Sequence, residues 1–155
     1  MNELSDIIAA EAVDAALQAA NKKALFHQLA SASGRLTGIE PKQILAAVLE
    51  REKIGSTGFG GGVAIPHAKM EGLPRVFGFF ARLATPVDYQ AVDRLPVDLA
   101  FLLLSPPDAG ADHLKALASI SRMFRDRQAL AKLRGARSKD AIFALLSGIE
   151  TRDAA

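Results

Sequence analysis

The chain has 155 residues, of which 50% are hydrophobic and none is cysteine, and its formal net charge is +2. This length can bury about 70% of the unfolded surface, which predicts one globular domain over residues 1–155 without disulfides. No apolar run approaches the roughly 20 residues of a membrane span, and the first residues carry acids where a secretory signal carries bases. We therefore expect a cytoplasmic protein with no membrane partner.

Single residues indicate where the first two helices begin and end. Asn21 predicts an N-cap, and Gly34 and Gly38 predict the end of the helix that follows it. Pro41 is typical of the first turn of a second helix, which would carry Arg51 in its last turn. The elements expected in this half are a strand over residues 13–17 and helices over residues 22–33 and from 41 to about 54.

The glycine-rich segment 55–67, GSTGFGGGVAIPH, is the most informative part of the sequence. Successive glycine N–H groups can converge on an anion, so the amides of Gly60, Gly61 and Gly62 are predicted to form a phosphate cradle. An apolar run over residues 63–65 predicts a short buried strand, and His67 follows it behind a proline. Because neutral imidazole is a nucleophile near neutral pH, His67 is a candidate for a phosphohistidine. Packing or simple surface exposure is the alternative for a lone histidine.

The order and spacing of the glycines exclude two better-known phosphate motifs, and a common zinc motif is also missing. A dinucleotide fingerprint needs a third glycine where Val63 stands, and it needs a strand before the loop and a helix after it. No Gly-Lys-Ser/Thr follows a glycine pair, and no His-Glu-x-x-His zinc motif is present. The sequence therefore gives no sign of direct ATP chemistry.

The second half of the chain predicts two strands followed by three helices. Apolar runs over residues 76–83 and 98–104 are typical of strands covered on both faces, and Ser105-Pro106-Pro107-Asp108 stops the second. Helices are expected over about 112–125, 128–135 and 139–146, and residues 150–155 are expected to be a frayed tail. The first of these helices is predicted to turn four apolar residues inward: Leu114, Leu117, Ile120 and Phe124. The architecture expected is a small α/β sandwich.

His113 is the second candidate functional residue. It follows Asp112 at the predicted start of a helix, where the positive end of the helix dipole keeps an imidazole neutral and favours a nearby anion. An exposed histidine in a capping turn is the alternative. His27 lies in the middle of a predicted helix without supporting neighbours, so we expect no functional role for it.

Basic residues gather late in the chain. They form either a solvated surface or a docking face for an acidic protein partner. Nucleic acid is not expected as a partner, because the chain has a single Tyr and no Trp on which bases could stack. The residues are Lys115, Arg122, Arg125, Arg127, Lys132, Arg134, Arg137 and Lys139.

Residues 51–67 resemble the signature of the phosphotransferase-system IIA family of mannitol/fructose type, and most of all its nitrogen-regulatory branch. The segment Asp112-His113-Leu114 resembles the second histidine site of that family, and the likeness covers essentially the whole chain. It implies a mixed, roughly five-stranded sheet flanked by helices. The chain differs from the family where Gly61 replaces a frequent Asn and Ala68 replaces a frequent Gly. Loss of the Asn removes a side-chain hydrogen bond but leaves the backbone cradle.

The resemblance implies a phosphocarrier that is phosphorylated on His67, with His113 donating to the phosphoryl oxygens and Arg51 balancing their charge. The donor would be a histidine-phosphorylated carrier protein, so neither ATP, nor metal, nor another cofactor is required. The phosphorylation state would regulate partners such as potassium-transport proteins, sensor kinases and stringent-response nucleotide synthetases.

Three alternatives stay open from the sequence. One is a sugar-uptake IIA component that passes phosphate to a fructose or mannitol IIB domain. Another is a zinc hydrolase that uses His67, His113 and Asp112, because two histidines and a carboxylate can ligate zinc. The last is an interaction module in which the glycine segment is only a turn.

Overall fold

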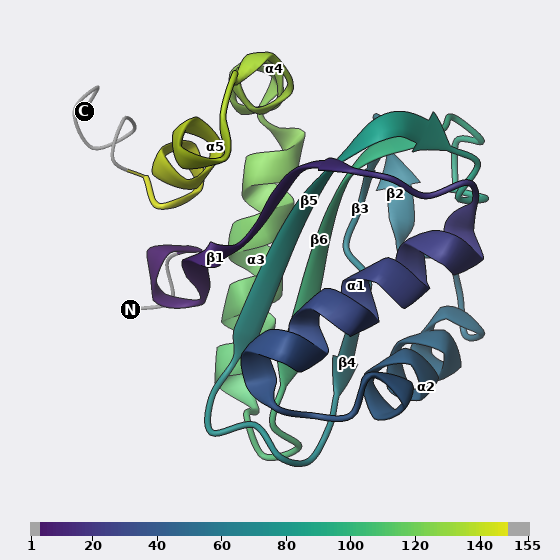
Figure 1. Ribbon diagram of the computed structural model, residues 1–155, viewed down its shortest axis with the longest axis vertical. Helices are drawn as coiled ribbons and strands as arrows, with labels where there is room; N and C mark the ends of the chain where they lie inside the picture. Colours follow the sequence, from purple (N-terminus) through teal and green to yellow (C-terminus); the bar gives the residue numbers. More distant parts are fainter. Residues whose placement is uncertain (1–3, 149–155) are drawn as a thin grey trace.

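A mixed six-stranded sheet forms the centre of the computed structural model, which describes residues 4–148 (Figure 1). Its strand order is β1-β5-β6-β3-β2, and β4 also pairs with β6. The strands are β1 (Ile8–Leu17), β2 (Gly58–Gly60), β3 (Val63–Ala64), β4 (His67–Lys69), β5 (Phe77–Val87) and β6 (Val97–Ser105). The helices are α1 (Lys22–Thr37), α2 (Pro41–Glu52), α3 (Ala111–Arg125), α4 (Arg127–Gly135) and α5 (Lys139–Leu146), and a 3₁₀ turn (Leu4–Asp6) precedes β1.

The sheet is mixed because β6 has parallel and antiparallel neighbours. It runs antiparallel to β5 and parallel to both β3 and β4, while β1 is parallel to β5 and β2 is antiparallel to β3. Helices α1 and α2 cover one face, and α3 lies behind the other face (Figure 1). Helices α4 and α5 follow α3, and α5 packs against the edge strand β1. None of the helices within residues 4–148 has the length and apolarity needed to cross a membrane.

The core lies between the sheet and its two helical layers. Strand β6 is the most buried of the long strands, since its residues 99–105 are at most 1% exposed, as the near-continuous apolar run predicted. The centre of the core is filled by aromatic and aliphatic side chains, among them Phe26, Phe80, Phe101, Ile44 and Ile120.

The strands β3 and β4 follow one another along the same edge of β6. Val63 pairs with Leu99 and His67 pairs with Leu103, and the two short strands are separated by residues 65–66. Pro66 has no N–H to continue the ladder, although its carbonyl still accepts a hydrogen bond from Leu103 N. This break divides one sheet edge into two strands, which is why the sheet has six strands where roughly five were expected.

Most predicted elements are present, with corrected bounds. Asn21 caps α1 through a bond from Ala24 N, but α1 continues past Gly34 and ends at Gly38, whose φ of 78° closes the helix. The expected strands over 13–17 and 98–104 are parts of the longer β1 and β6, whereas the strand expected over 76–83 begins one residue later and extends to residue 87 as β5. Helix α5 has the bounds expected, whereas α3 and α4 each begin one residue earlier. The expected tail, residues 150–155, lies outside the described residues.

Helix α3 differs from the prediction at one of the four expected inward positions, since Leu117 packs against the core and Ile120 and Phe124 are buried. Leu114 is 67% exposed, so its expected inward position is wrong. The buried side chains of α3 are those of His113, Ala116, Ile120 and Phe124, which follow the i, i+3, i+7, i+11 pattern of one helix face.

Candidate functional site

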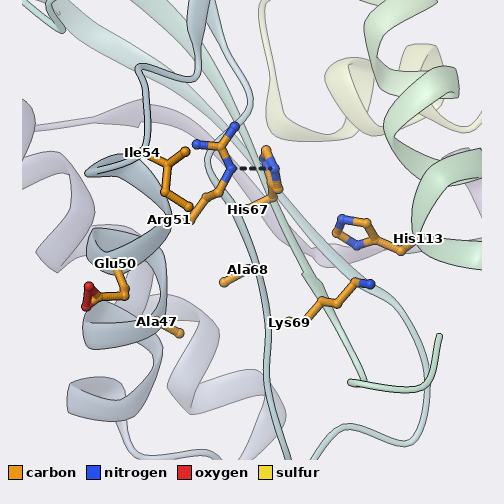
Figure 2. Close-up of a pocket in the computed structure, with 8 residues that line it drawn as sticks. All are labelled: Ala47, Glu50, Arg51, Ile54, His67, Ala68, Lys69 and His113. Carbon is orange, nitrogen blue, oxygen red and sulfur yellow. Dashed lines mark hydrogen bonds between the residues drawn. The ribbon is translucent and has the colours of Figure 1, made fainter. Parts of the chain in front are cut away.

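An open-sided pocket of about 520 Å³ lies between the end of α2, strand β4 and the start of α3 (Figure 2). The structure brings together in it the three side chains that the sequence singled out, Arg51, His67 and His113. Its lining consists of Ala47, Glu50, Arg51, Ile54, His67, Ala68, Lys69 and His113.

His67 is half-buried at the first position of β4, directly after the break at Pro66. Its Nδ1 lies 2.8 Å from the carbonyl oxygen of Ile65. A carbonyl can only accept, so Nδ1 carries the ring proton and Nε2 carries a lone pair. Burial is the main reason that the pKa of His67 is below its usual value, with the Ile65 bond acting in the opposite direction. At neutral pH the ring is therefore a neutral nucleophile whose unprotonated nitrogen is Nε2.

Arg51 contacts this unprotonated nitrogen from the last turn of α2. Its Nε–H donates to Nε2 of His67 at 3.2 Å, the bond drawn in Figure 2, and its Nη1 donates to the carbonyl oxygen of Gly55 at 3.0 Å. The positive charge of Arg51 contributes to the lowered pKa of His67. A guanidinium held in this way presents further N–H groups to an anion bound beside Nε2.

A buried polar network fixes the end of α2 that carries Arg51. The carboxylate of Glu52 accepts from the backbone N–H and the hydroxyl of Thr57, at 2.9 and 2.7 Å, and from Lys22 Nζ at 2.9 Å. Thr57 Oγ1 also lies 2.7 Å from the hydroxyl of Tyr89, a fully buried residue whose pKa is raised by burial. These contacts join α1, α2, the segment before β2 and the loop after β5, so the position of Arg51 is set by residues outside the pocket.

His113 faces the same pocket from the first turn of α3. Its ring centroid lies 5.7 Å from that of His67, and its Nδ1 lies 2.6 Å from the hydroxyl of the fully buried Ser105. Burial, followed by the proximity of His67 and Lys69, lowers the pKa of His113 to about 4. The ring is therefore neutral at neutral pH, and at 6% exposure it is not the solvent-exposed capping histidine that was the alternative.

The structure does not bring the three glycines to this pocket. Gly60 ends β2, and Gly61 and Gly62 form the tight turn to β3; the three φ values are 108°, 71° and 83°. Val63, which follows the turn, pairs with β6 four residues before His67 does, a separation of about 13 Å along the strand. Both backbone polar groups of Gly61 are bonded: its N–H donates to Asp93 and its carbonyl accepts from an arginine of α4.

The φ of Gly61 explains why glycine can replace the Asn that is frequent in the family at this position. A value of 71° lies in the left-handed region that Asn adopts more readily than most residues, so Gly or Asn fits this turn. The replacement preserves the backbone conformation there.

Two residues of the site were missed by the sequence reasoning. Lys69 stands two residues after His67, and side chains at that spacing share one face of a strand, so the alternation of β4 could have placed it beside the pocket. Ser105 was read only as part of the segment that ends β6, and no sequence pattern pairs it with a histidine eight residues later.

The zinc set considered for a hydrolase is divided between two places. His67 and His113 line the pocket described here, whereas Asp112 lines a different pocket beside the 3₁₀ turn and the start of β5. Within residues 4–148, no group of three histidine, cysteine, aspartate or glutamate side chains could hold a metal ion.

The sequence matches, over residues 6–148, the family described as phosphoenolpyruvate-dependent sugar phosphotransferase system, EIIA 2. The chain belongs to this family. As a IIA component of the phosphotransferase system, it is a phosphotransfer carrier. The match confirms the resemblance expected from residues 51–67.

Relatives refine this assignment. The IIA chain is 46% identical over 144 residues to a nitrogen regulatory protein of Bradyrhizobium diazoefficiens, covering 93% of this chain and 94% of that protein. It is 38% identical over 105 residues to a fructose-specific EIIA component of Haloferax volcanii, covering 68% of each. The crystal structure of nitrogen regulatory protein IIA-Ntr from Neisseria meningitidis superposes with a TM-score of 0.87 at 31% identity, covering 92% of this chain and 98% of that one. These findings confirm the expected fold and the nitrogen-regulatory resemblance.

Proposed function

We propose that this IIA chain accepts a phosphoryl group on Nε2 of His67 from a histidine-phosphorylated carrier protein and that its phosphorylation state regulates partner proteins of nitrogen and potassium metabolism. The observation that carries the proposal is the state of His67: Nδ1 is bonded to a carbonyl, and Nε2 lies beside Arg51 in an open-sided pocket. We also place the protein in the cytoplasm, where a phosphorylated carrier protein of the same phosphotransferase system would reach it.

The transfer needs no proton movement at His67. The lone pair of Nε2 attacks phosphorus, a new N–P bond forms, and the N–P bond of the donor breaks and returns its electron pair to the donor imidazole. Nδ1 keeps its proton throughout, and its bond to the Ile65 carbonyl stabilises the positive charge that the phosphorylated ring acquires. Nε2 can then no longer accept from Arg51, whose guanidinium donates to a phosphoryl oxygen instead.

The neighbouring groups stabilise charge rather than take part in covalent chemistry. Phosphoryl transfer passes through a loose transition state with charge on the equatorial oxygens, so donors placed around them supply most of the catalysis. Arg51, Lys69 and His113 line the pocket beside His67 from three elements. The partly exposed pocket rim includes apolar Ile54, which is 82% exposed and suits contact with a protein donor.

The direct test compares two histidine variants in a transfer assay with the labelled phosphorylated carrier protein. His67→Ala is expected to take up no label, and wild type is expected to gain the mass of one phosphoryl group. His27→Ala is the matched control, since His27 is exposed on α1 and does not line the pocket. The proposal fails if folded His67→Ala is still labelled.

A second variant separates the roles of the two histidines. His113→Ala is expected to keep His67 as the acceptor but to slow transfer, because a donor to the phosphoryl oxygens is lost. Complete loss of labelling with an intact fold would instead mean that the two roles are exchanged.

The likeness to a fructose-specific EIIA component favours one second candidate, a sugar-uptake role. In that case the phosphorylated chain would hand its phosphoryl group to a fructose-type or mannitol-type IIB domain. Mixing the labelled chain with such a IIB domain distinguishes the two functions: a regulatory protein retains the label, whereas an uptake component loses it within seconds.

A further inference from the structure

Ser105 contacts the site from behind His113 and has no place in the transfer described above. It is the last residue of β6, it is fully buried, and its Oγ lies 2.6 Å from Nδ1 of His113. Its backbone is held in the sheet, because its carbonyl accepts a bond from Met70 N and its position pairs with Lys69 of β4. The hydroxyl therefore has a fixed origin in the sheet, close to the first turn of α3.

The direction of this hydrogen bond follows from which groups can be satisfied. If Nδ1 of His113 donated, the hydroxyl hydrogen of Ser105 would need another acceptor, and the structure gives this hydroxyl no other partner among the described residues. A buried donor without an acceptor is strongly disfavoured. If Ser105 donates, its hydrogen and the lone pair of Nδ1 are both satisfied.

We propose that Ser105 is a positioning residue that donates to Nδ1 of His113 and thereby keeps the ring proton of His113 on Nε2. This inference rests on the proposed function, because it assigns a device to the same phosphoryl-transfer site. Figure 2 shows one nitrogen of the His113 ring turned toward His67, and since Nδ1 is occupied by Ser105, that nitrogen is Nε2.

The choice of tautomer decides whether His113 attracts or repels the group being transferred. With the proton on Nε2, the ring presents an N–H donor to phosphoryl oxygens beside His67. With the proton on Nδ1, the same position would present a lone pair to those oxygens. The ring is neutral at neutral pH, because burial above all, then His67 and Lys69, lowers the pKa of His113 to about 4. A neutral ring has one proton, so its placement matters.

The test replaces the hydroxyl and reads the tautomer directly. In Ser105→Ala the ¹⁵N signals of the imidazoles, recorded without any phosphoryl donor, are expected to show the proton of His113 shared between both nitrogens, whereas wild type shows it on Nε2. Transfer from the phosphorylated carrier protein is expected to slow roughly tenfold, the size of one lost hydrogen bond, with His67 still the acceptor. Ser105→Thr, which keeps a hydroxyl, is expected to restore both the tautomer and the rate.

Ser33→Ala is the matched control, since Ser33 is an equally buried serine on α1 whose hydroxyl has no hydrogen-bond partner among the described residues. It is expected to leave the tautomer of His113 and the transfer rate unchanged. The inference is overturned if wild type carries the proton on Nδ1, or if Ser105→Ala keeps both the wild-type tautomer and the wild-type rate. Failure of the proposed function has a different signature, labelling of His67→Ala, which leaves the tautomer measurement intact.

Discussion

Acidification is expected to destabilise the fold through His113. The pKa of His113 is about 4 in the folded chain against a usual value of 6.5, so between these values the unfolded chain binds more protons. The stability that the neutral ring provides is complete above pH 6.5 and is lost as the pH falls toward 4. One pKa unit corresponds to about 1.4 kcal/mol, and from pH 7 to 5 the loss is about 1 to 2 kcal/mol once screening by water in the open-sided pocket is included.

Urea denaturation at pH 7 and pH 5 measures this loss, and His113→Gln provides the control. Glutamine does not titrate, and its amide oxygen can still accept from Ser105, so the variant should lose about 1 to 2 kcal/mol less than wild type over the same interval. His67 also has a lowered pKa and adds to the acid loss in both proteins, so only the difference between them tests His113. Equal losses in wild type and variant would refute the reasoning.

Three further substitutions test the site and the core. Arg51→Lys keeps the charge but loses the Nε donor at 3.2 Å from His67, so label transfer is expected to slow roughly 100-fold, and an unchanged rate would contradict the role of that bond. Gly78→Ala would place a Cβ 2.6 Å from the ring of Phe101 and should cost about 1 to 3 kcal/mol in urea denaturation, with stability equal to wild type as the contrary result. Ile44→Ala leaves a cavity at a fully buried position of α2 and should lower the free energy of unfolding by about 2 to 5 kcal/mol in the same assay. A smaller loss would mean that the surrounding side chains move in to fill the cavity.

The parts of the fold that local chemistry determines could be predicted from the sequence. Asn21 and Pro41 located the starts of α1 and α2, because a capping side chain and a fixed φ act within one turn. The buried β6 was visible as an apolar run because both of its faces are covered. The site residues Arg51, His67 and His113 were recognised from motifs, and the pocket that joins them is a product of topology.

Helix α3 shows where local reasoning failed. Leu114 was expected to turn inward and an exposed histidine was one reading of His113, but in the structure His113 is buried and Leu114 is exposed. A histidine can occupy the inner face only if a buried partner satisfies its ring, and Ser105 of β6 provides that partner from another element. The inward position of His113 therefore depends on a contact with another element, which the hydrophobic periodicity of α3 does not predict.

The surroundings of the glycine turn could not be predicted for a related reason. The glycines were expected to aim their N–H groups at a phosphate; all three have positive φ values, but they do not line the pocket. The N–H of Gly61 is used by Asp93, which lies 32 residues away in the sequence. A run of glycines thus predicts a backbone conformation, while its ligand depends on which distant side chains the fold places beside it.

In the transfer that we propose, the pocket gives its two histidines opposite roles through the partner of Nδ1. For His67 the partner is the carbonyl of Ile65, which can only accept, so the proton stays on Nδ1 and Nε2 has a lone pair. For His113 the partner is the hydroxyl of Ser105, which can donate, so the proton is directed to Nε2. Two neutral imidazoles whose ring centroids are 5.7 Å apart thus present a nucleophile and a hydrogen-bond donor to the same space. Their different roles follow from these two second contacts, and exchanging the partners would exchange the roles.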